Sequence, residues 1–270
     1  MTFDISLLAA QHGPWSISKA GTASTCPAQF KHKYVAKTPG AITASANKVG
    51  TAAHTVLEHR VVGIDAVAAK KVAIEKTPLT AQERSDLRAL DDEIESFLRR
   101  FNAFCKREGV TELLREVEWG FTAGGKSTGF FADDVYFRGK LDLGAVTKNN
   151  DLFVLDHKSG VARVIHRDLS KKHQLYSYAV LAAINLPQLN GVRCGIHFLQ
   201  GQEGLRIQWL DYIPLSSIQR VYTPWLFGHL NDVAENLVEP FCAKPKANWP
   251  CKWCDFRQVC VPYQELIGGT

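Results

Sequence analysis

Asp156 and Lys158, spaced as D-x-K, stand at the end of an apolar run near the middle of this 270-residue chain. The run, residues 152–155, is continuously apolar, as expected of a strand buried on both faces. The polar residues 148–151 separate it from an earlier apolar run, and this pattern predicts a β-hairpin over residues 139–160. Because side chains alternate along a strand, Asp156 and Lys158 should point to the same face of the sheet.

The earlier run of the hairpin contributes a second carboxylate, Asp142. If the connecting loop is centred on Asn149 and has an odd number of residues, Asp142 lies opposite Asp156 on the same face. A two-residue turn would move Asp142 to the other face, so this prediction requires an odd loop or a bulge. Two carboxylates and the Lys158 ammonium would then converge at one end of the sheet.

These three side chains have a definite chemical use. Carboxylate oxygens are hard ligands that suit Mg²⁺ or Mn²⁺, and such an ion keeps open positions for water and for a phosphate. The ion can activate the water and stabilise charge on the phosphate, while a lysine beside it orients the nucleophile or neutralises the phosphorus centre. The alternative is a surface hairpin whose aspartate and lysine form an exposed ion pair of little energetic value.

A helix predicted over residues 47–62 carries His54 and Glu58 one turn apart on the same face. The two residues are either a polar pair on a helix surface or part of the same site, with His54 as a third metal ligand through an imidazole nitrogen.

A longer helix is predicted from Thr80, which forms a capping box with Glu83, to a stop at Gly109. Its apolar face indicates packing. Another amphipathic helix carries Gln174 and Tyr178 one turn apart. The other expected elements are helices over residues 16–36 (with a break at Cys26-Pro27), 168–185 and 214–237, and strands over residues 112–121, 192–200 and 205–211.

The segment Gly120–Ser127, GFTAGGKS, satisfies the phosphate-binding pattern G-x-x-x-x-G-K-[ST] letter for letter. A phosphate-binding loop of that kind must open a helix, whose N-terminal amides hold the phosphates. Strand-like aromatic residues follow here instead, so a glycine-rich hairpin loop explains the segment better. A P-loop ATPase is therefore the least favoured alternative function.

Three of the seven cysteines, Cys251, Cys254 and Cys260, form a C-x2-C-x5-C pattern near the C-terminus. Three thiols so close in sequence are hard to explain as core packing, and a fourth would complete a metal or cluster site. Four thiolates suit either zinc or an iron–sulfur cluster, and the spacing alone does not choose between them.

The overall composition is typical of a globular intracellular protein. No apolar run approaches the length of a membrane span. We expect no signal peptide, because no basic start is followed by an apolar stretch, and we therefore expect a cytoplasmic protein. The net charge of +5 permits nucleic-acid binding without arguing for it.

Taken together, His54, Asp142, Asp156-x-Lys158 and Gln174-x3-Tyr178 resemble, in order and context, the RecB-like branch of the PD-(D/E)XK nucleases. That branch has a helix histidine, a G-x-x-D strand, a D-x-K strand and a Q-x3-Y helix. The resemblance implies an α/β fold, with a restriction-endonuclease-like core of a mixed β-sheet flanked by helices. It also implies a single nuclease domain over residues 1–270, with a helical elaboration at about residues 60–110.

The same resemblance implies roles for particular residues. His54, Asp142, Asp156 and the backbone carbonyl of His157 would ligate Mg²⁺ or Mn²⁺, and Lys158 would be the catalytic lysine. In the family, the residues corresponding to Gln174 and Tyr178 lie close to the active site and help to bind DNA.

The cysteines resemble a subgroup of this branch that carries an iron–sulfur cluster, which includes the Cas4-type CRISPR-associated exonucleases and the AddB nuclease domain. The resemblance implies a [4Fe–4S] cluster that joins the N-terminal segment to the C-terminal one, at about residues 240–263, with zinc as the alternative. Its ligands would be Cys26, Cys251, Cys254 and Cys260, whereas Cys105, Cys194 and Cys242 are expected to serve only in packing.

We therefore expect a metal-dependent DNA exonuclease that acts on DNA ends or single strands, in prokaryotic or phage recombination, repair or DNA processing. Basic residues beyond the hairpin are expected to bind the DNA: Arg163, Arg167, Lys171 and Lys172. Expected protein partners are a recombination or single-strand-annealing protein or the proteins of CRISPR adaptation. The alternative is a non-catalytic DNA-binding or adaptor protein with the same fold, which the intact set of Asp142, Asp156 and Lys158 argues against.

Overall fold

The computed structural model describes residues 6–40, 45–162, 164, 169–237 and 251–268. The chain divides into two compact units, each built from separate stretches of sequence. Unit 1 comprises Met1–Thr43, Gly120–Arg138 and Thr223–Thr270, and unit 2 comprises Ala44–Trp119 and Gly139–Tyr222. The residues expected to bind metal and cleave DNA fall in unit 2, and the four expected cluster cysteines fall in unit 1. The single nuclease domain over the whole chain stays a prediction.

The β-strands form one sheet in the order β2-β1-β3-β4-β5-β6, with β7 paired to β5. β3 is antiparallel to β4, β4 is parallel to β5, and β5 is antiparallel to β6 and β7. The sheet is therefore mixed, as predicted. The strands are β1 (Val110–Thr122), β2 (Ser127–Thr128), β3 (Val135–Thr147), β4 (Asp151–Val161), β5 (Gly191–Gln200), β6 (Ile207–Trp209) and β7 (Ile213–Pro214).

The predicted hairpin is formed by β3 and β4, and its register confirms the odd loop. Leu143 pairs with Leu155 and Val146 pairs with Leu152, so the connection is three residues long and centred on Asn149. Asn150 adopts a left-handed conformation in this loop (φ 56°), which asparagine tolerates better than most residues. Continued by one step beyond the Leu143–Leu155 pair, this register sets Asp142 opposite Asp156.

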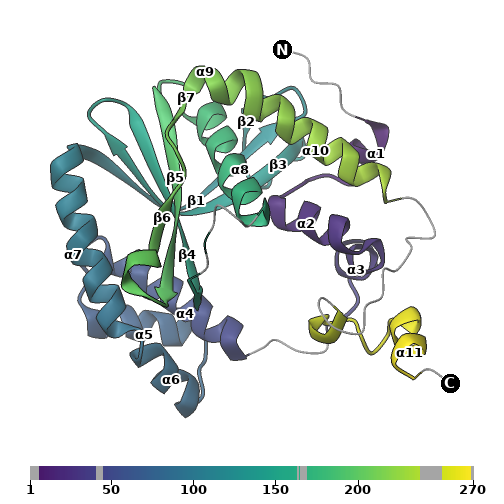
Figure 1. Ribbon diagram of the computed structural model, residues 1–270, viewed down its shortest axis with the longest axis horizontal. Helices are drawn as coiled ribbons and strands as arrows, with labels where there is room; N and C mark the ends of the chain where they lie inside the picture. The colour runs from purple at the N-terminus through teal and green to yellow at the C-terminus, as the bar shows by residue number, and fades with distance from the viewer. Residues whose placement is uncertain (1–5, 41–44, 163, 165–168, 238–250, 269–270) are drawn as a thin grey trace. The chain divides into compact units, whose positions relative to one another are not determined.

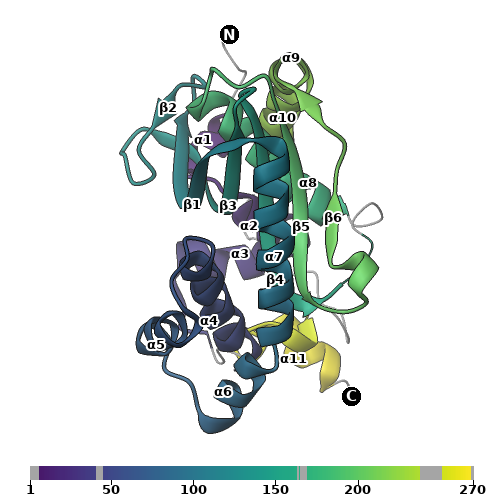
Figure 2. The ribbon, with the colours of Figure 1, turned by 90° about the vertical axis from the view of Figure 1, so that its left-hand side faces the viewer.

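In unit 2, α8 lies on one face of the sheet, and α7 runs along the strands on the other face (Figures 1 and 2). The strand preceding the D-x-K motif is buried between these layers, with Leu152 and Val154 fully buried. The helices of this unit are α4 (Ser45–Arg60), α5 (Ala66–Lys76), α6 (Ala81–Arg88), α7 (Asp91–Glu108), α8 (Leu169–Asn185) and the short α9 (Leu215–Ser217), which continues into a π-helical turn at Ile218–Tyr222.

The apolar face predicted from Thr80 onward is buried against the sheet. Ile94, Phe97 and Phe101 belong to one core cluster with the strand residues Leu143 and Leu155. The expected helical elaboration is thus α5, α6 and α7, and it closes one side of the core that carries the hairpin.

The prediction of one continuous helix from Thr80 to Gly109 is wrong, because the chain breaks between α6 and α7. The capping box of Thr80 and Glu83 is present, and Gly109 ends α7 with a φ of 61°. α7 starts anew at Asp91 with three consecutive acidic residues, which interact favourably with a helix N-terminus. The break also lets the chain bury Leu90, which is 5% exposed.

Unit 1 contains the predicted helix pair that meets at Cys26-Pro27, here α2 and α3. Residues from both ends of the sequence pack together in this unit, since the His32 ring stacks on Phe256 with centroids 5.4 Å apart. Its helices are α1 (Leu7–Gln11), α2 (Ile17–Thr25), α3 (Pro27–Phe30) with a π-helical turn at Lys31–Val35, α10 (Thr223–Glu235) and α11 (Val261–Ile267). None of the helices formed by the described residues combines the length and apolar character needed to span a bilayer.

The P-loop-like segment is a hairpin, as predicted. Gly120 pairs with Thr128 and Phe121 pairs with Ser127 across the turn between β1 and β2. Lys126 is exposed in this turn, and a strand rather than a helix follows it. The segment therefore lacks the helix N-terminus that would hold phosphates.

Substituting alanine for glycine should have opposite effects on stability at Gly109 and Gly228. Gly109→Ala should destabilise the protein by roughly 1–2 kcal/mol, because alanine is strained at the left-handed end of α7. Gly228→Ala should stabilise it by roughly 0.5–1 kcal/mol, because Gly228 lies inside α10 with open space around its Cα. Thermal unfolding of both variants checks this, and an equal shift in both would contradict the conformational explanation.

Candidate active site

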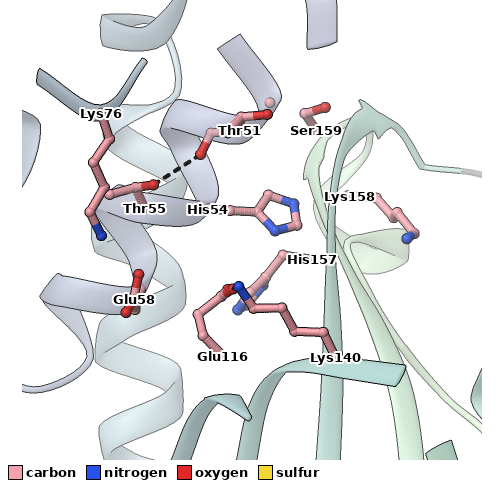
Figure 3. A pocket seen from close by; sticks show the side chains of 11 residues that line it. Thr51, His54, Thr55, Glu58, Lys76, Glu116, Lys140, His157, Lys158 and Ser159 are labelled. Carbon is pink, nitrogen blue, oxygen red and sulfur yellow. Dashed lines mark hydrogen bonds and ion pairs between the residues drawn. The ribbon is translucent and has the colours of Figure 1, made fainter. Parts of the chain in front are cut away.

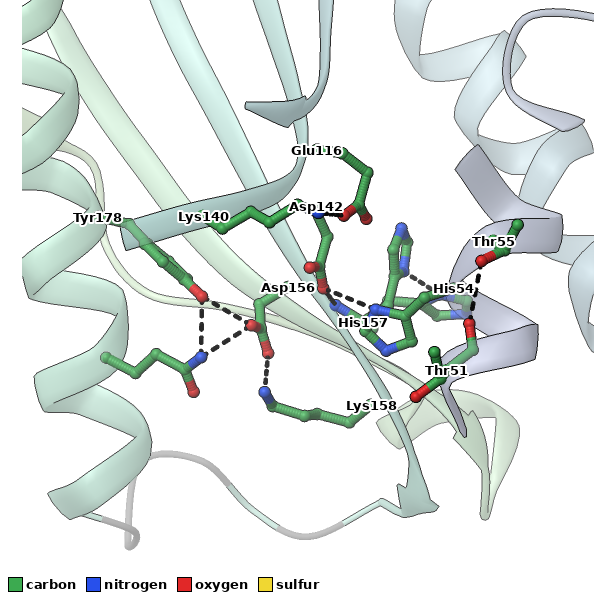
Figure 4. A network of polar contacts seen from close by, with 12 residues as sticks. Thr51, His54, Thr55, Glu116, Lys140, Asp142, Asp156, His157, Lys158 and Tyr178 are labelled. Atoms are coloured by element: carbon green, nitrogen blue, oxygen red, sulfur yellow. Dashed lines mark hydrogen bonds and ion pairs between the residues drawn. The ribbon is translucent and has the colours of Figure 1, made fainter. Parts of the chain in front are cut away.

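Asp156 lies at the end of β4 with a side chain that is only 2% exposed. Gln174 Nε2 and the Tyr178 hydroxyl, both on α8, donate to its Oδ1 at 2.9 and 3.0 Å. The Lys158 Nζ lies 2.6 Å from its Oδ2, which accepts no hydrogen bond of good geometry. The D-x-K pair and the Q-x3-Y pair thus meet at one carboxylate, as Figure 4 shows.

Asp142 lies on β3 beside Asp156 and binds residues of two other elements. The His54 Nδ1, on α4, lies 3.4 Å from Asp142 Oδ2. The backbone N–H of His157 donates to the same oxygen at 2.7 Å. The structure therefore brings His54, Asp142 and His157 together (Figure 4).

Glu116, on β1, is a member of the site that we did not predict. Ligand atoms of His54, Glu116 and Asp142 all lie within 4.8 Å of one another, close enough to hold one metal ion. Glu116 has a left-handed backbone conformation (φ 48°), which is rare for a residue other than glycine and costs free energy within a strand. The alternation of polar and apolar residues along the strand gave no sign of this local distortion. From the sequence, Glu116 and Glu118 look like two solvent-exposed residues of the same strand.

A pocket of about 560 Å³ opens beside these groups. His54 points into its centre from α4, and Lys140 reaches toward it from the sheet (Figure 3). Lys158 lines its edge, with its ammonium turned to Asp156. Lys76, from α5, and Glu58, one turn beyond His54 on α4, also line it. The pocket therefore combines a possible metal site with three lysine side chains, a set of charges that suits a phosphate group.

The charges of the site act strongly on one another. Burial alone would lower the pKa of His54, but the adjacent Asp142 carboxylate raises it above the ordinary histidine value. For Asp142, burial acts to raise the pKa, but the hydrogen bond and charge of His54 together with the contacts of His157 outweigh burial, so the pKa is lowered. Burial raises the pKa of Asp156, and the Lys158 ammonium opposes that rise without cancelling it. The negative charge of Asp156 is thus only partly balanced, and a divalent cation beside it would supply further positive charge.

The donor set fits Mg²⁺ or Mn²⁺. Carboxylate oxygens suit both ions, and a single imidazole beside them is compatible with Mn²⁺. Glu116 is also engaged by the Lys140 ammonium at 2.6 Å, and burial raises its pKa. Asp156 is not in the group of three ligand atoms, because its oxygens face Lys158, Gln174 and Tyr178.

The basic residues expected to bind DNA are only partly described. Arg163 and Arg167 lie outside the described residues. Lys171 and Lys172 lie in the first turns of α8, each half-buried, and Lys172 lines a second cavity of about 240 Å³ with Tyr176 and Tyr222.

The four cysteines expected at the cluster all lie in unit 1. Cys26 is 9% exposed and precedes α3, while Cys254 follows a 3₁₀ turn at Cys251–Trp253 and Cys260 precedes α11. Burial raises the pKa of Cys254, and the other three thiols add to that rise, so all three lie within electrostatic reach of Cys254. No three cysteine sulfurs in the described part of the chain lie within 4.8 Å of one another. Cys105 and Cys194 lie elsewhere, in unit 2, and Cys242 is outside the described residues.

A model of the PD-(D/E)XK nuclease superfamily matches residues 14–261. The chain belongs to this superfamily. The mixed sheet, with helices on both faces in unit 2, agrees with a PD-(D/E)XK core, and membership implies a nucleic-acid substrate.

Among solved structures, a protein from Eubacterium rectale, described provisionally as an exonuclease, is similar in fold. It has a TM-score of 0.51 at 14% identity, over 98% of this chain and 96% of that chain. The solved protein SSO0001 gives a TM-score of 0.34 at 18% identity, over 81% of this chain and 85% of that chain, which is too low to support a structural argument. None of the curated proteins compared with the sequence is a significant match.

Replacing the unexpected acidic residue tests the metal site. Glu116→Gln should weaken Mn²⁺ binding at least about tenfold, since it removes one charged oxygen from the group of three. Glu118→Gln is the matched control, because Glu118 lies on the same strand and is exposed. Calorimetric titration with Mn²⁺ measures both, and equal affinities for the two variants would show that Glu116 is not a ligand.

Proposed function

We propose that this member of the PD-(D/E)XK superfamily is a metal-dependent DNA exonuclease that hydrolyses phosphodiester bonds at DNA ends or in single strands. One observation carries the proposal. Asp142 and Asp156 lie opposite each other at the end of a buried hairpin, with Lys158, His54 and Glu116 close by. This arrangement places hard ligands for a divalent cation, together with the Lys158 ammonium, beside a pocket that can hold a phosphate.

Each residue has a proposed role in the reaction. His54, Glu116 and Asp142 would hold the ion, with Asp156 and the backbone carbonyl of His157 as further ligands. A bound Mg²⁺ or Mn²⁺ supplies an activated water and stabilises the charge that develops on the phosphate. Lys158, whose ammonium lies 2.6 Å from Asp156, orients the attacking water and neutralises part of that charge.

Gln174 and Tyr178 are proposed to position Asp156. Both donate to Asp156 Oδ1, and Gln174 Nε2 also donates to the Tyr178 hydroxyl at 2.8 Å. With Oδ1 held in this way, Oδ2 stays available for Lys158 and for the ion. Lys140 and Lys76 line the same pocket, where they can bind the phosphates on either side of the scissile one.

The choice of exonuclease follows the resemblance in sequence and the description of the similar Eubacterium rectale protein. A role in prokaryotic or phage DNA recombination, repair or processing, in the cytoplasm and with a recombination, annealing or CRISPR adaptation protein as partner, belongs to the same proposal. So does DNA binding by Arg163, Arg167, Lys171 and Lys172. A non-catalytic adaptor would have no use for a buried aspartate that is held by Gln174, Tyr178 and Lys158 at once.

We also propose that Cys26, Cys251, Cys254 and Cys260 hold a [4Fe–4S] cluster that joins the two ends of the chain. The effect of the other three thiols on the pKa of Cys254 supports the grouping of these four residues. The choice of an iron–sulfur cluster over zinc follows the resemblance in sequence, because four thiolates suit either. The stacking of His32 on Phe256 holds the same two ends of the chain together.

DNA degradation tests the proposed activity. The wild-type protein should degrade end-labelled linear DNA with Mn²⁺ or Mg²⁺, and Lys158→Ala should lower kcat at least about 100-fold because it removes the cation beside the reacting phosphate. Lys126→Ala, in the β1–β2 turn, is the matched control and should retain full activity. No degradation by the folded wild type with either metal would favour the adaptor, and loss of activity in Lys126→Ala would revive the P-loop hypothesis.

The proposed cluster has an optical test. Protein purified without oxygen should be brown and absorb near ~400 nm, and Cys254→Ser should lose the colour because one ligand is missing. Cys105→Ser should keep it, because Cys105 is a partly buried thiol of unit 2. Colourless protein with one equivalent of zinc would contradict the cluster and leave the nuclease proposal intact.

A further inference from the structure

A chain of buried polar side chains connects α7 to the D-x-K strand. It starts at Glu93, which is 4% exposed, and passes through His197 on β5, which is fully buried, to His157 on β4. The His197 Nε2 lies 3.1 Å from Glu93 Oε1, and the His197 Nδ1 lies 2.9 Å from the His157 Nδ1. All three residues belong to unit 2.

Glu93 is held in its charged form by two guanidinium groups. Arg100 Nη2 donates to Glu93 Oε1 at 2.8 Å, and Arg206 forms an ion pair with Oε2. Because an ionised carboxylate only accepts hydrogen bonds, the His197 Nε2 must carry the proton and donate it. Two arginines already face this carboxylate, so His197 has no further negative charge to stabilise a proton on both of its nitrogens.

The protonation of His197 fixes that of its neighbour. In a neutral imidazole one nitrogen donates and the other accepts, so the His197 Nδ1 accepts and the His157 Nδ1–H donates. Phe97 keeps both rings in place, since it stacks on His197 with centroids 4.2 Å apart and meets the edge of His157 at 5.2 Å.

His157 is therefore held through both its side chain and its backbone. Its side chain binds His197, and its backbone N–H binds the Asp142 carboxylate. Its neighbours in sequence are Asp156 and Lys158, which point to the other face of the strand. Fixing the orientation of His157 thus fixes the two reacting side chains beside it.

We propose that His197 is a positioning residue, whose tautomer Glu93 sets, and that it holds His157 so that Asp142 and the adjacent Asp156 present their oxygens to a divalent cation. The inference rests on the proposed function only in assigning that cation to DNA cleavage. The inference gives α7, through Glu93, a role in supporting the active site. The apolar face of α7 alone indicates only packing. Apolar residues could fill this buried space without the cost of desolvating a carboxylate, so packing alone does not require the polar chain.

Two different substitutions of His197 separate its contact with Glu93 from its contact with His157. His197→Gln places an amide near the former Nε2, so it keeps the contact with Glu93 and leaves the His157 Nδ1–H without its acceptor. His197→Asn places an amide near the former Nδ1, so it keeps the link to His157 and gives up Glu93. If the link to His157 positions the metal site, His197→Gln should bind Mn²⁺ about tenfold more weakly than wild type, and His197→Asn should stay within about twofold.

The measurements are Mn²⁺ binding by calorimetry and cleavage kinetics of the full-length variants. We expect kcat to fall in His197→Gln with an unchanged KM for DNA, because His197 is buried and does not reach the pocket. Equal Mn²⁺ affinities for the two variants, whether both normal or both weakened, would overturn the inference. Mn²⁺ binding does not depend on catalysis, so the two proposals can fail separately. A wild-type protein without nuclease activity would refute the proposed function. The comparison of Mn²⁺ affinities would still test the positioning role of His197.

A second measurement needs no variant, should either substitution fail to fold. Nitrogen-15 NMR of the histidine rings in the wild-type protein should show a neutral His197 protonated at Nε2 and a His157 protonated at Nδ1. The opposite tautomers, or a doubly protonated His197, would overturn the proposed chain of donors.

Discussion

Two carboxylates, Asp142 and Asp156, lie opposite each other at the end of two buried strands, and the cost of keeping negative charge there governs the surrounding structure. The three-residue loop centred on Asn149 sets the register that brings them to one face. A hairpin one residue shorter or longer would send Asp142 to the opposite side. Removing carboxylates from water is expensive unless each is paired or hydrogen-bonded.

Several elements around the hairpin offset that cost. α8 offers Gln174 and Tyr178 to Asp156, and α4 offers His54 to Asp142. β4 itself supplies Lys158 and the N–H of His157. The apolar contacts of α7 and the chain from Glu93 to His157 hold the strand from its other face. A divalent cation held at this possible metal site would offset the charge on Asp156 that these contacts leave unbalanced.

Local patterns in the sequence predicted much of this arrangement. The apolar run before Asp156, the turn around Asn149 and the one-turn spacing of Gln174 and Tyr178 each have one simple structural meaning, and each was confirmed. The break at Ala89-Leu90 could not be predicted in the same way, because an unbroken apolar face looks the same in one helix or two. Glu116 was missed because its position depends on a left-handed residue within β1, which the residue type does not signal.

The network from Glu93 to His157 could not be predicted from the sequence either. Glu93 and His197 lie 104 residues apart in the chain, and only the packing of α7 against β5 brings them together. The resemblance to a nuclease family pointed to the site residues one by one. What holds them in place depends on contacts between distant segments, which the structure supplies.

The most direct test of the central claim is a crystal structure of the protein grown with Mn²⁺, with the ion located by its anomalous scattering. We predict a peak within bonding distance of His54, Glu116 and Asp142, at the end of β3 beside Asp156. A fully occupied ion elsewhere, with these four side chains free of metal, would contradict the proposed active site.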